Sequence, residues 1–176
     1  MKNLVLVGFM GTGKTAVGQR VAARLGLTFV DTDHLIEQRT GQSIAQIFET
    51  QGEPYFRKFE RELVRELVAR QGHVIATGGG IVLDPNNVRD FARTGVVICL
   101  WAEPAVIYER TRYAKHRPLL QETDPRRRIE ELLHQRAPLY QAIALRVDTS
   151  YTTVEKNVEA VSALYRDQTA SAHAGI

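Results

Sequence analysis

Residues that can bind phosphate groups stand close to the start of the chain, in a glycine-rich segment. Residues 8–15 fit the pattern Gly, four free positions, Gly-Lys-Thr, between an apolar run at 4–7 and a helical pattern beginning at Lys14. In a strand–loop–helix setting, glycines let successive backbone N–H groups point at one spot, where the helix N-terminus adds partial positive charge. Lys14 can reach the β- and γ-phosphates, and the Thr15 hydroxyl can ligate Mg²⁺. We interpret the segment as a polyphosphate-binding loop, because a simple glycine turn explains neither Lys14 nor Thr15.

Two aspartates stand where a second predicted strand ends. Asp31 and Asp33 follow residues 28–30, and their spacing puts both on one face of an extended segment. Beside a triphosphate, one carboxylate can lie near Mg²⁺ and the other near the hydroxyl that accepts the phosphoryl group. The alternative is a helix cap, a role that Asp33 can also fill.

Three glycines, residues 78–80, follow a third predicted strand at 73–76. Glycines without side chains let backbone N–H groups approach a ligand closely, although a plain linking turn is the alternative interpretation. In many P-loop NTPases an aspartate at this place helps to hold Mg²⁺. Because Thr77 and glycine occupy it here, Asp31 is the better candidate for the metal side.

Arginines are the candidate groups for binding anions. Arg57 lies next to the apolar face of its predicted helix, and Arg136 follows two leucines that we expect to be buried. Each can instead be a structural arginine whose stem covers apolar surface. Glu60, three residues after Arg57, can orient it by a salt bridge. Arg117 lies in a charged, irregular segment and is typical of an arginine that a mobile lid brings onto a transferring phosphoryl group.

The elements that must position these residues are strands alternating with helices. Apolar runs predict strands at residues 4–7, 28–30, 73–76, 96–100 and 144–147. Helical patterns occupy the intervals, among them 14–25, 34–39, 85–93, 103–112, 125–136 and 153–166. This alternation predicts an α/β fold with a parallel sheet and right-handed crossovers. Since ligands of such sheets bind beyond the carboxyl ends of the strands, we expect the loop, the aspartates and the glycines to share one cleft.

Composition sets limits on the function. The 176 residues suit one domain, and 44% hydrophobic with 24% charged residues is typical of a soluble globular protein. The net charge of +3 is too small to indicate a nucleic-acid binder, and the arginines at 126–128 are interpreted as a solvated face. No apolar run approaches the roughly 20 residues of a membrane span.

The single cysteine, Cys99, allows no disulfide within the chain, and it lies in an apolar run where we expect it to be buried. Because a strand and the phosphate loop occupy the N-terminus, no signal peptide is expected there, and the location is predicted to be cytoplasmic. Residues 168–176 are small and polar and are predicted to be a disordered tail.

Taken together, these residues resemble the shikimate kinase family, over about residues 2–161. The resemblance rests on an ordered set of motifs: the phosphate loop, Asp31-Thr32-Asp33, Phe56-Arg57 with Glu60, Thr77 with the three glycines, Arg117-Pro118-Leu119-Leu120, and Arg136 with Leu139-Tyr140. It implies a three-layer P-loop NTPase fold of the nucleoside-monophosphate-kinase type, with a five-stranded parallel sheet flanked by helices. It also implies a lid at about 113–124 and a helical substrate-binding segment at about 33–60, all within one kinase domain at 1–167.

The activity that the resemblance implies is transfer of the ATP γ-phosphoryl group to the 3-hydroxyl of shikimate, with Mg²⁺, on the route to chorismate and the aromatic amino acids. Catalytic roles are implied for Lys14, for Asp33 as proton acceptor and for Arg117. Substrate contacts are implied for Asp33, Arg57, Gly79, Gly80 and Arg136, with the two arginines on the carboxylate and the glycines acting through their backbone.

On the nucleotide side, the resemblance implies ATP contacts for Gly11, Thr12, Gly13, Lys14, Thr15, Ala16, Arg110 and Arg117. Arg110 corresponds to a residue that packs on adenine, and the loop at 148–151 borders the same base. Mg²⁺ contacts are implied for Thr15 and Asp31. The expected partners are ATP and shikimate, with no nucleic acid and no membrane, and the chain is expected to be a monomer.

Other functions remain as alternatives. A P-loop kinase of another small hydroxy acid, such as gluconate, shares the loop and the sheet, although the paired aspartates and the three glycines argue against it. An adenylate-type kinase lacks support, because nothing indicates a second nucleotide pocket. A binding protein without catalysis would be expected to lack Lys14, Asp33 or the arginines, and all are present. A nucleic-acid binder would show steep salt dependence.

Overall fold

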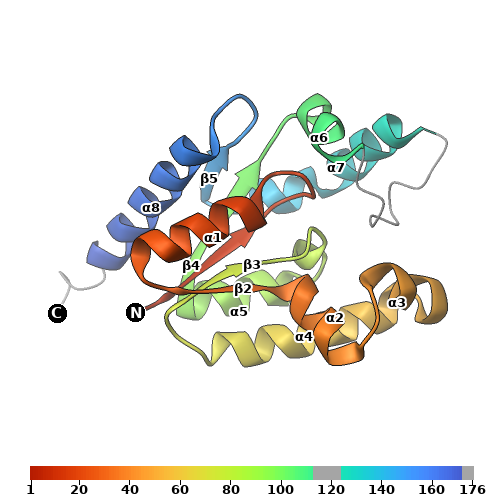
Figure 1. The fold of residues 1–176 in the computed structure, drawn as a ribbon, viewed down its shortest axis with the longest axis horizontal. Coiled ribbons are helices and arrows are strands. Elements are labelled where there is room, and N and C mark those ends of the chain that lie inside the picture. Colours follow the sequence, from red (N-terminus) through yellow and green to blue (C-terminus); the bar gives the residue numbers. More distant parts are fainter. Residues whose placement is uncertain (113–123, 172–176) are drawn as a thin grey trace.

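A parallel sheet forms the middle layer of the protein (Figure 1). The computed structural model describes residues 1–112 and 124–171. In these residues the sheet has five strands in the order β2-β3-β1-β4-β5, and every neighbouring pair is parallel. The strands are β1 (Asn3–Val7), β2 (Thr28–Asp31), β3 (His73–Ala76), β4 (Gly95–Trp101) and β5 (Leu145–Asp148). The predicted α/β fold with a five-stranded parallel sheet is confirmed.

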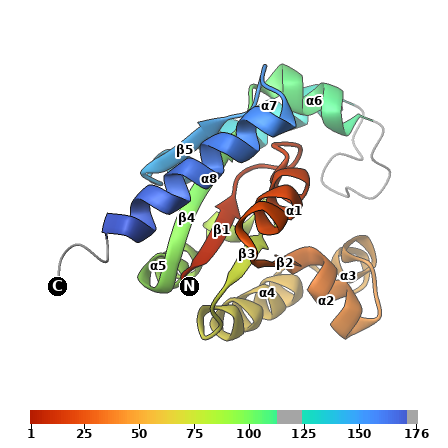
Figure 2. The ribbon, with the colours of Figure 1, turned by 60° about the vertical axis from the view of Figure 1, so that its left-hand side comes forward.

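Helices cover both faces of the sheet. They are α1 (Lys14–Leu25), α2 (Thr32–Thr40), α3 (Ile44–Gln51), α4 (Glu53–Val68), α5 (Pro85–Thr94), α6 (Pro104–Thr111), α7 (Pro125–Gln141) and α8 (Val154–Ser171), with a short 3₁₀ helix η1 (Ile81–Leu83) after β3. Helices α1 and α8 lie side by side over one face, whereas α4, α5 and α7 pack on the other (Figures 1 and 2).

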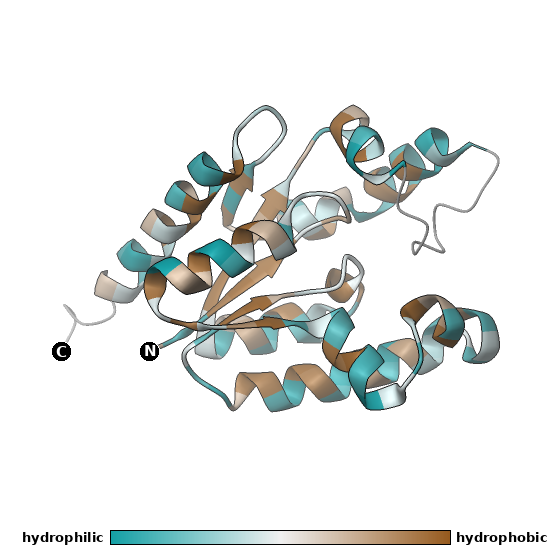
Figure 3. Cartoon of the chain, in the orientation of Figure 1, coloured by the Kyte–Doolittle hydropathy of each residue, from teal (hydrophilic) through white to brown (hydrophobic). Residues whose placement is uncertain are grey.

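The central strand β1 shows how the sequence builds these layers. All five of its residues are buried. Because side chains alternate along a strand, Leu4 and Leu6 join the core under α1 and α8, while Val5 and Val7 join the core on the opposite face. The middle strands therefore read as continuous apolar runs, which appear as brown arrows between helices with polar outer sides in Figure 3.

Two helices extend five residues beyond their predicted ends. Helix α7 continues past Arg136 to Gln141 and contains Pro138, and its later residue Tyr140 is 1% exposed. Helix α8 reaches Ser171, so residues 168–171, predicted as part of a disordered tail, are helical instead. Tyr165 anchors the end of α8 in the core, and Thr169 Oγ1 donates to its carbonyl. Burial of Tyr140 thus accompanies the extension of α7, and the hydrogen bond from Thr169 joins the added turn of α8 to Tyr165.

The strand order brings three chain segments to one edge of the sheet. Strand β3 lies between β1 and β2, with Ala76 opposite both Leu6 and Asp31. The segments that follow these strands are therefore neighbours at the carboxyl edge, as expected for ligand sites of parallel sheets. The predicted lid at 113–124, apart from its last residue, lies outside the described residues. None of the helices in the two described parts of the chain combines the length and the apolar character that a membrane crossing requires.

Candidate functional site

A cavity of about 590 Å³ opens at this carboxyl edge. Most of the predicted site residues line it together: Gly11, Gly13, Lys14, Thr15, Ala16, Asp31, Asp33, Arg57, Gly79, Gly80, Arg110 and Arg136. They come from the loop after β1, from the junction of β2 and α2, from the turn after β3, and from α4, α6 and α7. Thr12 does not line the cavity, and Arg117 lies outside the described residues.

The loop after β1 adopts a conformation that needs glycine. Gly8, Gly11 and Gly13 all have positive φ angles, and Gly13 caps the N-terminus of α1. A Cβ atom on Gly8 would lie 2.2 Å from the carbonyl oxygen of Leu100. Lys14 arches back over the loop, and its Nζ donates to the carbonyls of Gly8 at 2.8 Å and Phe9 at 2.9 Å. The ammonium group is thus held at the mouth of a helix N-terminus, where anions bind favourably.

Thr12 has a structural place in this loop. The residue is fully buried, its Oγ1 donates to the carbonyl of Phe9 at 2.8 Å, and it is not among the residues that line the cavity. Its carbonyl accepts from Oγ1 of Thr149, in the segment after β5, at 3.0 Å. In this arrangement, therefore, the side chain of Thr12 cannot make the nucleotide contact that the resemblance implies.

Asp31 has two roles, one for each carboxylate oxygen. Oδ1 accepts from the backbone N–H groups of Asp33 at 3.1 Å and His34 at 3.3 Å, which makes Asp31 the N-cap of α2. Oδ2 accepts from Oγ1 of Thr15 at 2.9 Å. The alternative that Asp33 caps this helix is wrong, because Asp31 is the residue with extended backbone angles directly before the first turn.

The pair of oxygens from Thr15 and Asp31 suits a magnesium ion. Mg²⁺ prefers hard oxygen ligands, and it usually keeps several waters and takes substrate phosphate oxygens rather than a complete protein cage. The described parts of the chain contain no group of three or more His, Cys, Asp or Glu side chains that could hold a metal ion.

Asp33 is free of the capping role and faces the cavity. Its Oδ1 is buried and has no hydrogen-bond partner within residues 1–112 and 124–171. Burial, together with the neighbouring charge of Asp31, raises its pKa to about 6, against the opposing effects of Lys14 and Arg57. A carboxyl group with this pKa can accept a proton near neutral pH.

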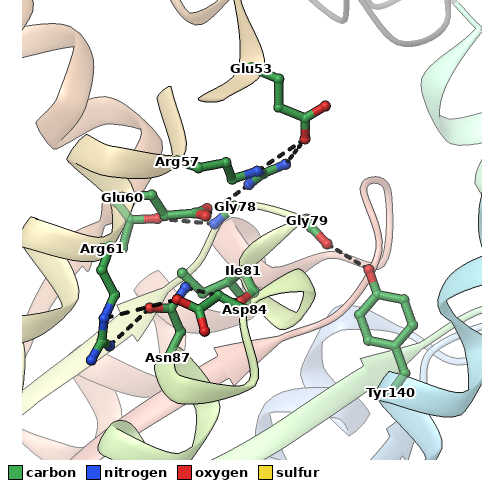
Figure 4. Close-up of polar contacts among 11 residues, drawn as sticks. Glu53, Arg57, Glu60, Arg61, Gly78, Gly79, Ile81, Asp84, Asn87 and Tyr140 are labelled. Atoms are coloured by element: carbon green, nitrogen blue, oxygen red, sulfur yellow. Dashed lines mark hydrogen bonds and ion pairs between the residues drawn. The ribbon is translucent and has the colours of Figure 1, made fainter. Parts of the chain in front are cut away.

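Arg57 is held between two carboxylates of its own helix (Figure 4). Its Nε and Nη2 donate to Oε1 of Glu53 at 3.0 and 2.7 Å, and its Nη1 donates to Oε2 of Glu60 at 2.8 Å. The predicted salt bridge to Glu60 is confirmed. The contact with Glu53 was not predicted, although its spacing of four residues on a helix was a usable signal.

Glu60 is itself unusual, because it is 1% exposed. Burial raises its pKa to about 7, although the ion pair with Arg57 favours the charged form. Its second oxygen, Oε1, is buried without a partner in the described residues. Glu60 therefore positions Arg57 from beneath the cavity.

Arg136 approaches the same cavity from α7. It is 6% exposed, its guanidinium lies 5.8 Å from the centre of the Phe9 ring, and its Nη1 is buried without an acceptor in the described residues. A buried cation without a full set of partners favours an anionic ligand. By contrast, Arg126 and Arg127 are exposed and pair with Glu130 and Glu131, which confirms the predicted solvated face for these two. Arg128, the third arginine of that prediction, is half-buried, and its Nε is shielded from solvent.

Two of the three glycines leave room for side chains of the cavity. A Cβ on Gly78 would lie 2.6 Å from Oδ1 of Asp33, and one on Gly80 would lie 2.2 Å from Nη2 of Arg57. The plain linking turn is therefore an incomplete interpretation, because side chains here would displace the groups of the cavity. The N–H of Gly78 donates to Oγ1 of Thr32 at 3.0 Å, a contact that the sequence pattern did not reveal.

Arg110 connects the phosphate loop to the segment after β5. Its Nη1 donates to the carbonyl of Gly11 at 3.2 Å, and its Nη2 donates to the carbonyl of Thr149 at 2.6 Å. These bonds place the guanidinium at the nucleotide end of the cavity. Its packing on adenine stays a prediction.

Apolar side chains form one wall of the cavity, and the sequence did not predict that they belong to the site. Ile44 and Phe48 from α3 and Phe56 from α4 line the cavity, and the rings of Phe48 and Phe56 lie 5.2 Å apart. Their helical spacing was visible, but it indicated only a buried face. The tertiary arrangement turns part of that face towards a ligand.

Comparison with known proteins identifies relatives over nearly the full length. The family model described as shikimate kinase matches residues 10–165. A shikimate kinase of Caldanaerobacter subterraneus subsp. tengcongensis is 48% identical over 165 residues, which cover 94% of this chain and 96% of that protein. One of Pelotomaculum thermopropionicum is 49% identical over 159 residues, covering 90% and 92%.

Solved structures agree. A shikimate kinase from Acinetobacter baumannii, in complex with shikimate, superposes with a TM-score of 0.91 at 36% identity, covering 96% of this chain and 94% of that one. A gluconokinase from Sinorhizobium meliloti superposes with a TM-score of 0.63 at 15% identity, covering 97% of each chain, which shows a shared fold alone.

The raised pKa of Asp33 predicts how stability depends on pH. A carboxyl group whose pKa is higher in the folded state, about 6 against 3.8, favours folding below pH 4, and this contribution is lost as pH rises through 6. The Asp33→Asn variant has no carboxyl group at this position and so lacks this pH-dependent loss of stability. Between pH 4 and pH 7, the unfolding free energy of the variant should therefore rise by about 2 kcal/mol relative to that of the wild type. Denaturant unfolding at several pH values measures this. Glu62→Gln, on an exposed position of α4, serves as control, and parallel curves for wild type and Asp33→Asn would refute the prediction.

Proposed function

The chain belongs to the shikimate kinase family, and from this membership we propose that it transfers the γ-phosphoryl group of ATP to the 3-hydroxyl of shikimate. The products are ADP and shikimate 3-phosphate. The observation that carries the proposal is the single cavity that joins a phosphate loop to Asp33, Arg57 and Arg136. The match at residues 10–165 and the likeness to a shikimate-bound kinase support it.

At the donor end, the backbone of residues 11–15 binds the phosphates of ATP, and Lys14 lies against their charge. Thr15 and Asp31 would hold Mg²⁺, which would supply positive charge beside the phosphate oxygens. The hydrogen bond between Oγ1 of Thr15 and Oδ2 of Asp31 supports this assignment, because it brings two hard oxygen ligands together beside the loop. Arg110 borders the adenine through its position between the phosphate loop and the segment after β5.

At the acceptor end, Arg57 and Arg136 bind the carboxylate of shikimate. Forked guanidinium groups match a carboxylate geometrically, and both arginines line the cavity. Glu53 and Glu60 hold the guanidinium of Arg57 in place, so little conformational freedom is lost on binding. The apolar wall of Ile44, Phe48 and Phe56 encloses the ring of the substrate.

Asp33 takes the proton of the reacting hydroxyl. As the bond from the 3-oxygen of shikimate to the γ-phosphorus forms, the bond from that phosphorus to the β-bridging oxygen of ADP breaks, and the hydroxyl proton passes to the Asp33 carboxylate. The unpartnered Oδ1 and the raised pKa of Asp33 support this role. The lid arginine, Arg117, completes the proposal by stabilising charge on the transferring group, although it lies outside the described residues.

The proposal includes a cytoplasmic monomer. A cytoplasmic location fits the use of ATP as the phosphoryl donor. Size-exclusion chromatography with light scattering measures the oligomeric state directly.

A coupled assay for ADP release tests the activity and separates it from gluconate phosphorylation. With ATP and Mg²⁺ present, shikimate should support turnover, and gluconate at the same concentration should give at most about a hundredth of that rate, because it lacks the ring that the apolar wall encloses. Equal rates with the two acids would contradict the proposed specificity.

Arg57→Lys tests the carboxylate site. Because lysine lacks the fork, KM for shikimate should rise at least about tenfold while KM for ATP stays near the wild-type value. Arg61→Lys is the matched control, since Arg61 lies one turn further along α4 and pairs with Asp90 outside the cavity. An unchanged KM for shikimate in Arg57→Lys would remove Arg57 from the carboxylate site.

Asp33→Asn tests the proton acceptor. Turnover should fall by about 100-fold or more, because an amide cannot accept the proton, while the Kd for an ATP analogue stays unchanged. Stopped assays measure turnover, and calorimetry measures nucleotide binding. Near-normal turnover would exclude Asp33 as the acceptor.

A further inference from the structure

The turn after β3 is a β-turn whose two central residues are both glycine. The N–H of Ile81 donates to the carbonyl of Gly78 at 3.2 Å and closes the turn. Gly80 has φ −95° and ψ 5°, the values of the third position in a type I turn. The peptide between Gly79 and Gly80 is thus the central peptide of this turn.

Steric restrictions within the turn allow either of two orientations of that peptide, those of a type I and a type II turn. Types I and II differ mainly by rotation of the central peptide, and a glycine in the third position accepts the positive φ that type II requires. Because the peptide is trans, the carbonyl of Gly79 and the N–H of Gly80 point in opposite directions. Whatever holds the carbonyl therefore decides where the N–H points.

Tyr140 holds this carbonyl. Its Oη donates to the carbonyl oxygen of Gly79 at 2.6 Å, and the side chain is 1% exposed (Figure 4). Burial raises the pKa of the Tyr140 hydroxyl, so it stays protonated and remains a donor. The bond spans from α7 to the turn after β3, 61 residues apart in the chain.

The amide that faces away from Tyr140 lies next to the arginine site. Within residues 1–112 and 124–171, the N–H groups of Gly79 and Gly80 donate no hydrogen bond. A Cβ on Gly80 would lie 2.2 Å from Nη2 of Arg57, so the backbone of Gly80 abuts that guanidinium. Arg136 lies one turn before Tyr140 on α7 and lines the same cavity.

We propose that Tyr140 is a positioning residue for substrate binding. Its hydroxyl selects the orientation of the Gly79–Gly80 peptide that presents the Gly80 N–H to the anion bound by Arg57 and Arg136. The inference rests on the proposed function, because the anion is the carboxylate of shikimate. It gives α7 two tasks one turn apart, since Arg136 binds the carboxylate and Tyr140 orients the amide beside it.

Tyr140→Phe tests the inference, because it keeps the ring and removes the hydroxyl, which holds the Gly79 carbonyl and also interacts with Arg136. The orientation of the Gly79–Gly80 peptide is therefore measured together with KM. Without the bond to the Gly79 carbonyl the peptide can rotate, so KM for shikimate should rise about three- to tenfold. The turnover number and KM for ATP should stay within about twofold of the wild type, since neither the phosphate loop nor Asp33 is touched.

Tyr165→Phe is the matched control. Tyr165 is also a buried tyrosine whose hydroxyl donates to a backbone carbonyl, that of Lys2 at 2.7 Å, but it lies on α8 away from the cavity. It should lower the thermal midpoint about as much as Tyr140→Phe while leaving KM for shikimate unchanged. If the two variants have equal KM values, Tyr140 is only structural and the inference is overturned.

A crystal structure of Tyr140→Phe provides the second measurement and separates the two proposals. A rotated Gly79 carbonyl supports the inference, and an unrotated one overturns it, whether or not shikimate is the substrate. Failure of the wild type to phosphorylate shikimate refutes the proposed function instead. If Tyr140→Phe is too unstable to assay at 25 °C, both variants and the wild type are assayed at 10 °C with the same expected KM change.

Discussion

Parallel pairing of three strands is the constraint on which the site depends. Because β3 lies between β1 and β2 in register, with Ala76 opposite both Leu6 and Asp31, the segments after all three strands meet at one edge. Backbone hydrogen bonds of the sheet thereby set the distance between a phosphate loop and an acceptor site. Side chains buried on both faces of β1 keep this framework rigid. Donor and acceptor groups can then be held in a reactive geometry without a separate domain.

Within this framework, charge and burial oppose each other. Lys14, Arg57 and Arg136 bring positive charge to a cavity that is lined by the carboxyl group of Asp33, and the carboxyl group of Glu60 is buried behind Arg57. Burial raises the pKa of both carboxyl groups, so each holds its proton at a higher pH than an exposed one. The arginines are held by ion pairs or stacked against aromatic rings. The cavity is thus organised before a ligand arrives, which reduces the entropy lost on binding.

Much of this arrangement could be predicted from short patterns. The phosphate loop combines a strand, glycines and a helix start within 15 residues, so the local sequence is enough to predict that it binds phosphate groups. The salt bridge of Arg57 with Glu60 follows from helical spacing. The sequence predicted less well which of two similar side chains fills a given role. Either Asp31 or Asp33 can cap a helix, and the backbone angles of Asp31 decided between them. Thr12 fits the loop pattern, yet its side chain packs inside the loop.

The sequence by itself determined the alternation of strands and helices, the phosphate loop and the types of residue available for catalysis, because each depends on neighbours within a few positions. Only the tertiary structure decided which of several arginines face the cavity. Arg57 and Arg61 lie on the same helix, but one lines the site and the other pairs with Asp90. It also decided that Tyr140 meets Gly79, since that contact joins residues 61 positions apart. Periodicity reports which face of a helix is buried, but contacts between distant segments depend on how the sheet orders its strands.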